Sequence, residues 1–534
     1  MTQTAFPDPY ESGRAAGWKI VDASALTQDL TLEADVVIVG SGAGGGTAAE
    51  ILAESGWRVV LVEEGPLQTS RDFRMRESEA YPALYQESAA RKTRDKAINI
   101  LQGRCVGGGT TVNWTSSFRT PAATLAHWAK AHGLKGYGEA ELAPWFERME
   151  KRLNVSPWPI APNENNDLLR RGAEALGIPT AMIRRNVRGC WNLGYCGMGC
   201  PTNAKQSMLL TTVPAALAAG ATLLTRTRAE KLVLDRDRVT GLECRALDGA
   251  GIFPGKARIT VRAQHYVLAA GAIGSPALLL RSGAPDPHGL LGRRTFLHPT
   301  VVSAALLRDP VEGFSGAPQT VYSDHFLDTL PVDGPIGFKL EAPPIHPVLA
   351  AITLPGEGAE HARWMRELPR LHVLIALLRD GFHPGSEGGR VLLRGDGSPV
   401  LDYPFTPYLG EGFRRALKVM AEIQFAAGAR VVMPMHQDAG VYRNFETAKR
   451  MIAKLSPDAL RMRVVSAHVM GGCPLGDDPR RSVVNLSGRH HQIENVHVFD
   501  GSLFPTSIGA NPQLSIYALA ARLAEGLVRG ARRG

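Results

Sequence analysis

The chain has 534 residues, 44% of them hydrophobic and 21% charged, which is ordinary for a soluble globular protein and predicts two domains or one interleaved pair. The formal net charge is +9, but lysine and arginine are scattered, so nucleic-acid binding is not expected and only a weak attraction to an anionic membrane surface stays open. Six cysteines exclude a disulfide scaffold, and residues 1–9 lack the basic start and apolar core of a secretory signal, so we expect a cytoplasmic protein, at most peripheral to a membrane.

The first functional signal is a glycine turn after residues 35–39, a β-branched run that predicts a buried strand. Gly40, Gly42 and Gly45 have the G-x-G-x-x-G spacing. In that spacing the first glycine makes the tight turn, the second admits a pyrophosphate to the backbone, and the third lets helix and strand pack closely.

The residues after this turn complete a dinucleotide-binding unit. A helix is expected over 43–55 and a return strand over 58–63, which ends at Glu63. A carboxylate at that point accepts the hydroxyls of a ribose, and the phosphates lie on the helix N-terminus. The segment therefore predicts a bound adenine dinucleotide.

A second glycine loop follows at residues 103–113. It contains Gly103, Gly107 and Gly108 and ends at Asn113. Missing side chains allow the backbone to approach a flat ligand closely. We therefore expect this loop to contribute to the same binding domain.

Three cysteines cluster in a glycine-rich segment, at Cys190, Cys196 and Cys200. Three thiols in such a loop could hold an iron–sulfur centre. The alternative is a compact loop with free thiols or one bridge, and we favour it because there is no C-x-x-C pair and no fourth ligand nearby.

An uncharged run lies between Lys205 and Arg226 and is long enough to span a bilayer. Pro214, Gly220 and several polar residues interrupt it, so we expect a helix over 207–219 and a strand from residue 221 instead. No transmembrane helix is predicted.

The central part of the chain predicts further strands and a second domain. Residues 221–245 read as paired strands, and 266–275 as a buried strand before a helix at Pro276. Residues 391–403 predict a hairpin, and 413–427 an amphipathic helix. The hairpin and the helix predict a second domain, in which an antiparallel sheet with helices covers the cofactor.

The last 70 residues carry the second strong signal. His468 lies beside a Gly-Gly turn, and Asp500 and Gly501 form an acidic turn after a strand. Asn511 and Pro512 then open a terminal helix as its expected cap and first residue. A helix N-terminus at this point would stabilise negative charge on a ligand such as a reduced flavin.

Taken together, the two glycine loops, the segment 269–276, the histidine segment and the Asp-Gly-Ser…Asn-Pro ending resemble the glucose-methanol-choline (GMC) oxidoreductases, which are FAD enzymes that oxidise alcohols. The resemblance covers nearly the whole chain. It implies an α/β fold with a Rossmann-like FAD-binding domain assembled from distant segments, at 30–310 and 464–534, with an inserted lid and cysteine loop at about 120–204. An α+β substrate domain on an antiparallel sheet is expected at 311–463.

The resemblance also implies the site. His468 falls where the family has its active-site histidine and Asn511 where it has the partner, in the form found in cholesterol oxidase and choline oxidase. His468 would act as base and Asn511 would hold the substrate oxygen while hydride passes to flavin N5. The implied FAD-binding residues are Gly40, Gly42, Gly45, Glu63, Gly103, Gly107, Gly108, Asn113, Lys231, Gly271, Asp500, Gly501, Pro512 and Gln513; no metal is expected.

Other features refine this expectation. Val112 stands where covalently flavinylated members can carry histidine, so the FAD should be bound without a covalent link. Apolar runs at 345–354 and 371–378 favour a long-chain, sterol-like or aromatic alcohol over a sugar. Glu341 is either an auxiliary base or a surface carboxylate, and His298 is expected to be structural.

Some alternatives stay open at this stage. His490 and His491 are expected in a solvated turn. A non-redox lyase of the same fold, a sugar or polyol dehydrogenase and a nicotinamide dehydrogenase are alternative functions. The electron acceptor, whether oxygen, a quinone or another carrier, does not follow from the sequence.

Overall fold

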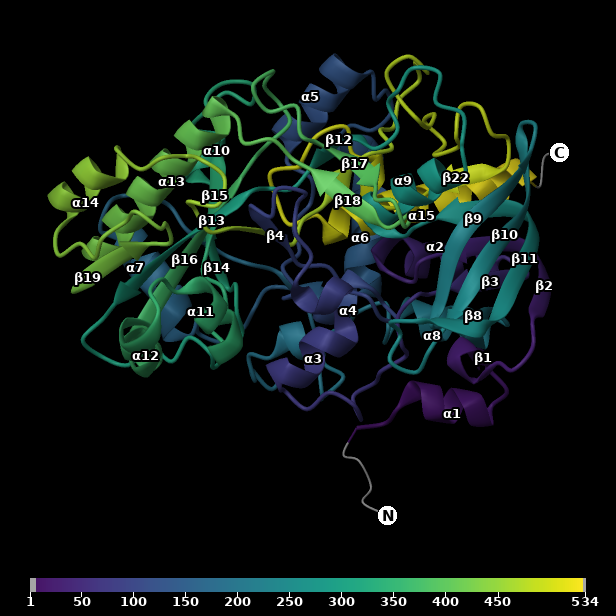
Figure 1. Ribbon diagram of the computed structural model, residues 1–534, viewed down its shortest axis with the longest axis horizontal. Helices are drawn as coiled ribbons and strands as arrows, with labels where there is room; N and C mark the ends of the chain where they lie inside the picture. Colours follow the sequence, from purple (N-terminus) through teal and green to yellow (C-terminus); the bar gives the residue numbers. More distant parts are fainter. Residues whose placement is uncertain (1–5, 532–534) are drawn as a thin grey trace.

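The computed structural model describes residues 6–531. Residues 1–5, which belong to the segment 1–9 in which no secretory signal is expected, lie outside the described part. Two large sheets form its frame (Figure 1), with the strands of one toward the right and those of the other toward the left.

The first sheet has eight strands in the order β1-β8-β3-β2-β11-β10-β9, with β22 also beside β11. They are β1 (Lys19–Asp22), β8 (Thr222–Thr225), β3 (Val59–Val62), β2 (Leu30–Val39), β11 (Pro254–Leu268), β10 (Arg238–Leu247), β9 (Thr227–Asp235) and β22 (Val496–Val498). Strands β1, β8, β3, β2, β11 and β22 pair in parallel. Strands β10 and β9 are added to β11 in antiparallel pairs. The expected Rossmann-like domain built from distant segments is confirmed.

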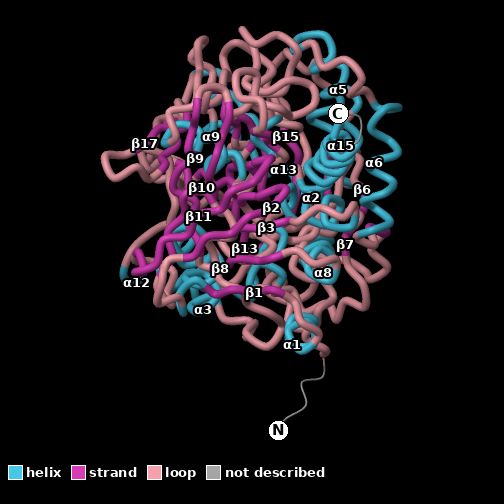
Figure 2. The backbone as a smooth tube through the Cα atoms, turned by 90° about the vertical axis from the view of Figure 1, so that its right-hand side faces the viewer, coloured by secondary structure: helices cyan, strands magenta, loops and turns pink. Residues whose placement is uncertain are grey.

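Helices cover one face of this sheet, as Figure 2 shows for α2 (Ala43–Glu54), α6 (Glu139–Arg152), α8 (Thr212–Ala218) and α15 (Gln513–Ala531). All four residues of β3 are buried, because parallel strands in such a layered domain are covered on both faces. This explains why the sequence of β3 is a continuous apolar run rather than an alternating one.

The second sheet has the order β4-β20-β13-β16-β15-β14-β6, with β19 also beside β13. The strands are β4 (Ile98–Ile100), β20 (Val464–Ser466), β13 (Thr300–Leu306), β16 (Leu371–Leu378), β15 (Phe338–Glu341), β14 (Val321–Ser323), β6 (Ala181–Met182) and β19 (Val431–Pro434). All pairs are antiparallel except β4 with β20.

Each face of the second sheet has its own apolar core. Leu374 and Leu378 of β16 pack in the core shared with α13 (Pro407–Ala426). Val373 and Ile375 point to the opposite side, into the core shared with α11 (Pro347–Thr353) and α12 (Gly358–Arg366). Successive strand residues face opposite sides, so a strand buried on both faces is apolar throughout.

A four-stranded sheet adjoins both halves, in the order β18 (Pro399–Asp402), β17 (Gly389–Leu393), β12 (Arg293–Phe296) and β21 (Met470–Gly471). The hairpin of β17 and β18 around residues 396–397 confirms the turn signal there. The remaining elements are α1 (Pro9–Ala15), α3 (Glu77–Leu84), α4 (Gly109–Val112), α5 (Ala122–His132), β5 (Val155–Ser156), α7 (Glu164–Glu174), β7 (Arg185–Asn186), α9 (Gly271–Arg281), α10 (His325–Asp328), α14 (Phe445–Ile452) and five short 3₁₀ turns.

Two boundaries differ from the sequence-based expectation. Helix α8 begins at Thr212 rather than at residue 207, which places Pro214 in its first turn, where a missing N–H costs nothing. The second sheet also includes β4, β6, β13 and β20, which lie outside the residues 311–463 of the expected substrate domain. Short strands such as β4 and β20 are recognisable only by their partners in the sheet.

Among residues 6–531, no helix is both long enough and apolar enough to cross a bilayer.

Candidate active site

The first glycine loop joins β2 to α2 by close backbone contacts. Gly40 has φ +99°, and its N–H donates to the carbonyl oxygen of Val62 over 2.7 Å. A Cβ on Gly45 would lie 1.8 Å from the carbonyl oxygen of Gly40, so no other residue fits there. The first and third glycines therefore have the structural roles that the motif predicts.

The second glycine loop lies directly against the first. Gly108 has φ +51°, and a Cβ on it would come within 2.9 Å of Gly42 Cα. A Cβ on Gly103 would in turn lie 2.5 Å from the carbonyl of Gly108. With no side chains between them, the two loops present bare backbone to the neighbouring space.

Glu63 fastens these loops to each other. Its carboxylate accepts hydrogen bonds from Ser41 N at 3.0 Å, Ser41 Oγ at 2.6 Å and Gly65 N at 2.8 Å. Ser41 Oγ also accepts the N–H of Gly107 at 3.0 Å. Burial raises the pKa of Glu63, and these hydrogen bonds partly offset that shift.

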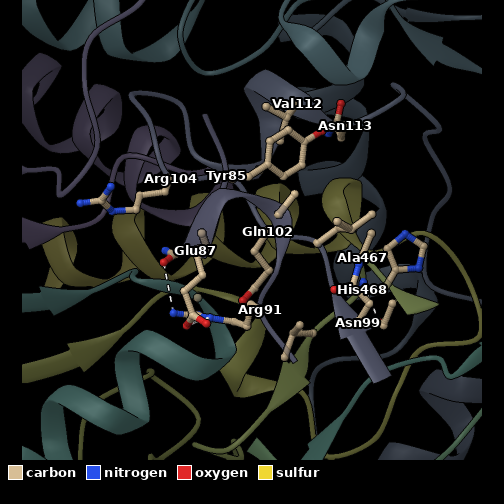
Figure 3. Close-up of a pocket in the computed structure, with 18 of the residues that line it drawn as sticks. Tyr85, Glu87, Arg91, Asn99, Gln102, Arg104, Val112, Asn113, Ala467 and His468 are labelled. Carbon is tan, nitrogen blue, oxygen red and sulfur yellow. Dashed lines mark hydrogen bonds and ion pairs between the residues drawn. The ribbon is translucent and has the colours of Figure 1, made fainter. Parts of the chain in front are cut away.

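A single cavity of about 1440 Å³ runs along both loops and under the second sheet. Gly40, Gly42 and Glu63 line it at one end, and His468 and Asn511 line it elsewhere. Figure 3 shows Val112, Asn113 and His468 around the same space. Residues that are hundreds of positions apart in the sequence thus share one cavity.

The C-terminal segment supplies a polar part of the cavity wall. Asp500 accepts the N–H of Gly271 at 2.8 Å and the Ser275 hydroxyl at 2.5 Å. This contact fixes the start of α9 at Gly271, five residues before the predicted start at Pro276. At the first residue of α15, Gln513 Oε1 accepts the Asn113 amide at 2.7 Å.

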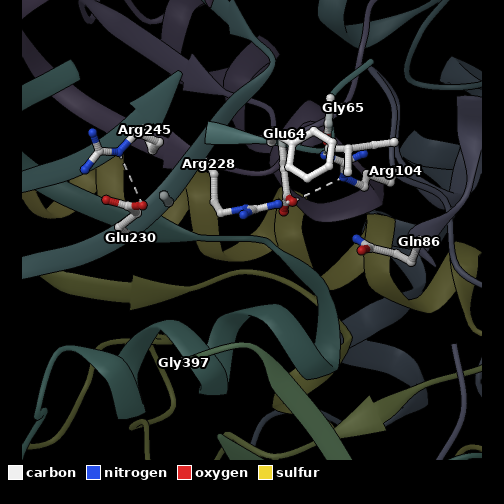
Figure 4. A network of polar contacts seen from close by, with 12 residues as sticks. Glu64, Gly65, Gln86, Arg104, Arg228, Glu230, Arg245 and Gly397 are labelled. Atoms are coloured by element: carbon white, nitrogen blue, oxygen red, sulfur yellow. Dashed lines mark hydrogen bonds and ion pairs between the residues drawn. The ribbon is translucent and has the colours of Figure 1, made fainter. Parts of the chain in front are cut away.

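A charge cluster that the sequence analysis missed lies beside Glu63. Arg104 and Arg228 both donate to Glu64 Oε1, at 3.2 and 3.1 Å, and they reach it from opposite sides in Figure 4. Burial raises the pKa of Glu64, but the charges of the two arginines outweigh it and the net shift is downward. The two arginines come from different strands and loops, so no local spacing announces this cluster.

His468 is linked to a second histidine. Its Nδ1 lies 3.2 Å from Nδ1 of His298, whose Nε2 accepts the backbone N–H of Gly509 at 3.0 Å. Burial, and secondarily the charge of Lys339, lower the pKa of His468 to about 4, so its imidazole is neutral at pH 7. His298, expected to be structural, does not line the cavity, but it contacts His468 directly.

Asn511 contacts Glu341 rather than the helix that follows it. Its Nδ2 donates to Glu341 Oε2 at 3.4 Å, and its Oδ1 has no hydrogen-bond partner. The predicted cap is therefore wrong: the side chain faces the site instead of the N–H groups of α15. Glu341 is not a surface carboxylate either, since it is fully buried and also accepts from Gln319.

Comparisons with known proteins agree with this geometry. Two family models, both described as GMC oxidoreductase, match residues 81–300 and 384–520. The chain belongs to the GMC oxidoreductases. It is 30% identical over 94% of its length to the uncharacterized GMC-type oxidoreductase y4nJ of Sinorhizobium fredii, of which it covers 95%.

A further relative and a solved structure are similar to this chain. The long-chain-alcohol oxidase FAO1 of Arabidopsis thaliana is 29% identical over 92% of this chain and 67% of its own length. The crystal structure of pyridoxine 4-oxidase from Mesorbium loti has a TM-score of 0.66 at 21% identity and covers 92% of this chain and 98% of its own. That structure supports the fold. The family membership makes this protein an FAD-dependent oxidoreductase.

The residues present fit an FAD. Gly42 and Gly108 leave bare backbone where a side chain would fill the cavity, and α2 begins directly after Gly42 with its N–H groups free. Gln513 begins α15 at another part of the wall, where a second helix N-terminus is available. The wall of the cavity joins the glycine loops to His468 and Asn511, so a dinucleotide and a substrate can share one space.

The cysteine loop of this GMC oxidoreductase supports the second glycine loop. All six cysteines are free thiols, and within residues 6–531 no three metal-ligating side chains come together. The buried Lys205 donates to the carbonyl oxygens of Thr111, Asn113 and Cys196, at 2.6, 2.8 and 2.6 Å. Burial lowers its pKa to about 8. Lys205 thus holds α4 against the cysteine loop.

Lys231, expected to bind the cofactor, and His490 and His491, expected in a solvated turn, are placed differently in the structure. Lys231 is exposed on β9 and is absent from the cavity wall, to which Ala229 and Glu230 contribute. His490 is not solvated: it is 1% exposed, and its Nδ1 accepts the N–H of Gln492. His491 is half-buried and contacts Ser482.

Proposed function

We propose that this GMC oxidoreductase oxidises the CH–OH group of an apolar alcohol to an aldehyde or ketone. One observation carries the proposal: the cavity that passes the glycine loops also reaches His468, Asn511 and an apolar chamber. A single space can therefore hold a dinucleotide and an alcohol in contact.

The chamber lies on the face of β13 and β16 that α11 covers. Its wall includes Val302, Ile345, Leu354, Val373, Ile375 and Leu377. Val348 and Ile352 of α11 also line it and are 41% and 54% exposed, so the apolar wall continues to the surface. Such a wall favours alkyl or ring carbons over the hydroxyl groups of a sugar. The name of the Arabidopsis relative, a long-chain-alcohol oxidase, agrees with this choice.

The residues that would hold FAD are those of the two glycine loops, with Glu63, Asn113, Gly271, Asp500, Gly501, Pro512 and Gln513. When bound, FAD supplies the acceptor for the hydride of the alcohol carbon. The buried Val112 lines the cavity and has no atom that could bond to the flavin. We expect acid or heat to release intact FAD into the supernatant, and flavin retained by the precipitated polypeptide would contradict this.

The hydrogen bonds of His298 support a donor role for His468. Because Gly509 N–H donates to His298 Nε2, a neutral His298 carries its proton on Nδ1. This Nδ1–H then donates a hydrogen bond to His468 Nδ1. A neutral His468 then carries its own proton on Nε2. We infer that His468 donates this N–H to the alcohol oxygen and stabilises the negative charge that develops there, rather than acting as the base we expected from the sequence.

Glu341 is the better candidate for the proton acceptor. Its Oε1 and Asn511 Oδ1 are buried acceptors without a donor, and the two side chains touch through Asn511 Nδ2. A substrate hydroxyl, or one water between it and Glu341, supplies the missing donor. Burial raises the pKa of Glu341 to about 7, which suits a base at neutral pH.

The pH dependence of flavin reduction tests this division of roles. Under anaerobic conditions the rate should fall about tenfold per pH unit below pH 7 if ionised Glu341 takes the proton. A base with the pKa of His468, about 4, would instead give a flat profile from about pH 5.5 upward. Glu341→Gln should lose about 10²-fold or more in rate together with the pH dependence, and retention of both would exclude Glu341.

A panel of alcohols separates the remaining alternatives. Bleaching of the flavin by apolar alcohols without oxygen supports the proposal, whereas bleaching by sugars alone would indicate a sugar or polyol dehydrogenase. A flavin that no alcohol bleaches would favour a lyase of the same fold. Adding oxygen or a quinone to the reduced protein then identifies the electron acceptor.

A further inference from the structure

A buried ion pair lies behind the active site, where no sequence motif indicates it. Lys339 of β15 is 1% exposed, and its Nζ lies 2.6 Å from Oδ1 of Asp324, whose side chain is 27% exposed. The same Nζ lies 3.9 Å from the ring centroid of Phe118 and 4.1 Å from that of Tyr322. Burying a lysine is costly even with one carboxylate partner, which points to a function for Lys339.

The position of Lys339 on β15 relates it to Glu341. Residues two apart on a strand face the same side, so the ammonium and the Glu341 carboxylate project from one face of β15. Tyr322, which contacts Lys339, is also the cross-strand partner of Glu341. The ammonium and the carboxylate are thus neighbours inside the protein, where charges are weakly screened.

Other charged groups around Glu341 act less directly. Arg185 donates to the backbone carbonyl of Gln319. The charge of Arg379 is a minor cause, after burial, of the lowered pKa of His298. The titratable and charged side chains on the neighbouring elements are Asp324, Asp328, Tyr322, His298, His468, Arg185 and Arg379. Burial is the largest cause of the raised pKa of Glu341; the charge of Lys339 and the hydrogen bond from Asn511 lower that pKa, and the charge of Asp324 raises it.

Lys339 lowers the pKa of His468 as well as that of Glu341. Its positive charge is the second cause, after burial, of the lowered pKa of His468. One ammonium therefore disfavours a proton on His468 Nδ1 and on Glu341 alike. This is the charge pattern that an N–H donor and a proton acceptor need at neutral pH.

We propose that the Lys339–Asp324 pair is a positioning element that sets the balance between the protonated and ionised forms of Glu341 and favours a neutral His468 in the resting enzyme. The positive charge of Lys339 stabilises the carboxylate of Glu341. The negative charge of the partly exposed Asp324 offsets part of that stabilisation. The inference rests on the proposed role of Glu341 as proton acceptor. In this proposal Lys339 favours the ionised form of Glu341 and Asp324 favours its protonated form.

The test compares the pH profile of anaerobic flavin reduction in two variants of the holoenzyme. Lys339→Met should move the midpoint upward by about one pH unit or more, because a nearby opposite charge is lost. Asp324→Asn should move it downward. Rates on the high-pH plateau and flavin content should stay close to those of the wild type, since neither side chain lines the cavity.

A second readout does not depend on turnover. The infrared band of the protonated Glu341 carboxyl, identified by its loss in Glu341→Gln, should titrate with the same shifted midpoints. Lys339→Arg keeps the charge and should keep the profile, and Asp328→Asn removes a nearby acid that is not paired with Lys339 and should leave the midpoint in place. If Lys339→Met does not fold, Asp324→Asn decides the question, because its side chain is partly exposed.

The outcomes separate this inference from the proposed function. If Glu341→Gln keeps the wild-type midpoint, Glu341 is not the acceptor and both proposals fall. If it abolishes the midpoint while Lys339→Met and Asp324→Asn leave the wild-type midpoint unchanged or move it in the same direction, the charge-pair proposal alone is overturned.

Discussion

The part of the cavity along the glycine loops and the part under the second sheet are built in different ways. Around the first sheet, the wall includes bare backbone: Gly42 and Gly108 meet without side chains between them, and Glu63 accepts the N–H groups of Ser41 and Gly65. Under the second sheet the wall is made of side chains, with apolar residues in the chamber and His468 and Asn511 beside it.

This difference explains which residues can be recognised in advance. A backbone cradle needs glycine at fixed short spacings, because any Cβ would collide, and so it leaves a local pattern. A side-chain wall needs only apolar character or one polar group at each place, which many sequences satisfy. Substitutions in the two parts of the cavity test that contrast.

Gly42→Val should abolish FAD retention. A Cβ at this position meets only Gly108 Cα, at 3.8 Å, so the protein should fold, while the valine methyl groups occupy the cavity beside the backbone. Flavin content of the purified protein and its thermal unfolding measure the two effects separately. Gly526→Ala, at an open position in α15, is the matched control, and a flavin-replete Gly42→Val protein would place the cofactor elsewhere.

His468→Ala should keep its FAD and slow flavin reduction by alcohol by about 10²-fold or more, since a donor to the alcohol oxygen is lost. Rapid anaerobic mixing measures the rate apart from binding. The exposed His288 provides the control variant, His288→Ala, which should behave as the wild type. An unchanged rate in His468→Ala would remove this residue from the mechanism.

Val302→Thr should lower kcat/KM for long-chain alcohols about tenfold and leave short-chain alcohols nearly unaffected, because it adds a hydroxyl group to the chamber wall. Val301→Thr is a matched control on the same strand. Val301 faces the core on the α13 side, so its replacement should cost about 1–3 kcal/mol of stability without changing chain-length preference. Equal effects on selectivity would contradict the placement of the chamber.

The sequence predicted the polar residues of the catalytic region only in part. His468 and Asn511 were identified through the family resemblance, but Asn511 was expected to cap α15 and instead contacts Glu341. His298 gave no signal, because a histidine before a proline is common and its partners, Gly509 and His468, are about 200 residues away. Nothing local distinguishes such a residue from a structural one.

The sequence alone determined the dinucleotide unit from β2 to β3, the hairpin of β17 and β18, and the order of the glycine loops. These features follow from short-range rules: strand periodicity, turn chemistry and backbone clearance act within a few residues. The packing of distant segments determines which strands complete the second sheet, that His298 lies against His468, and that Lys339 and Asp324 lie on the same side of the second sheet as Glu341. Those relations depend on through-space distance and burial, which residues far apart in the chain acquire only when the two sheets pack around one cavity.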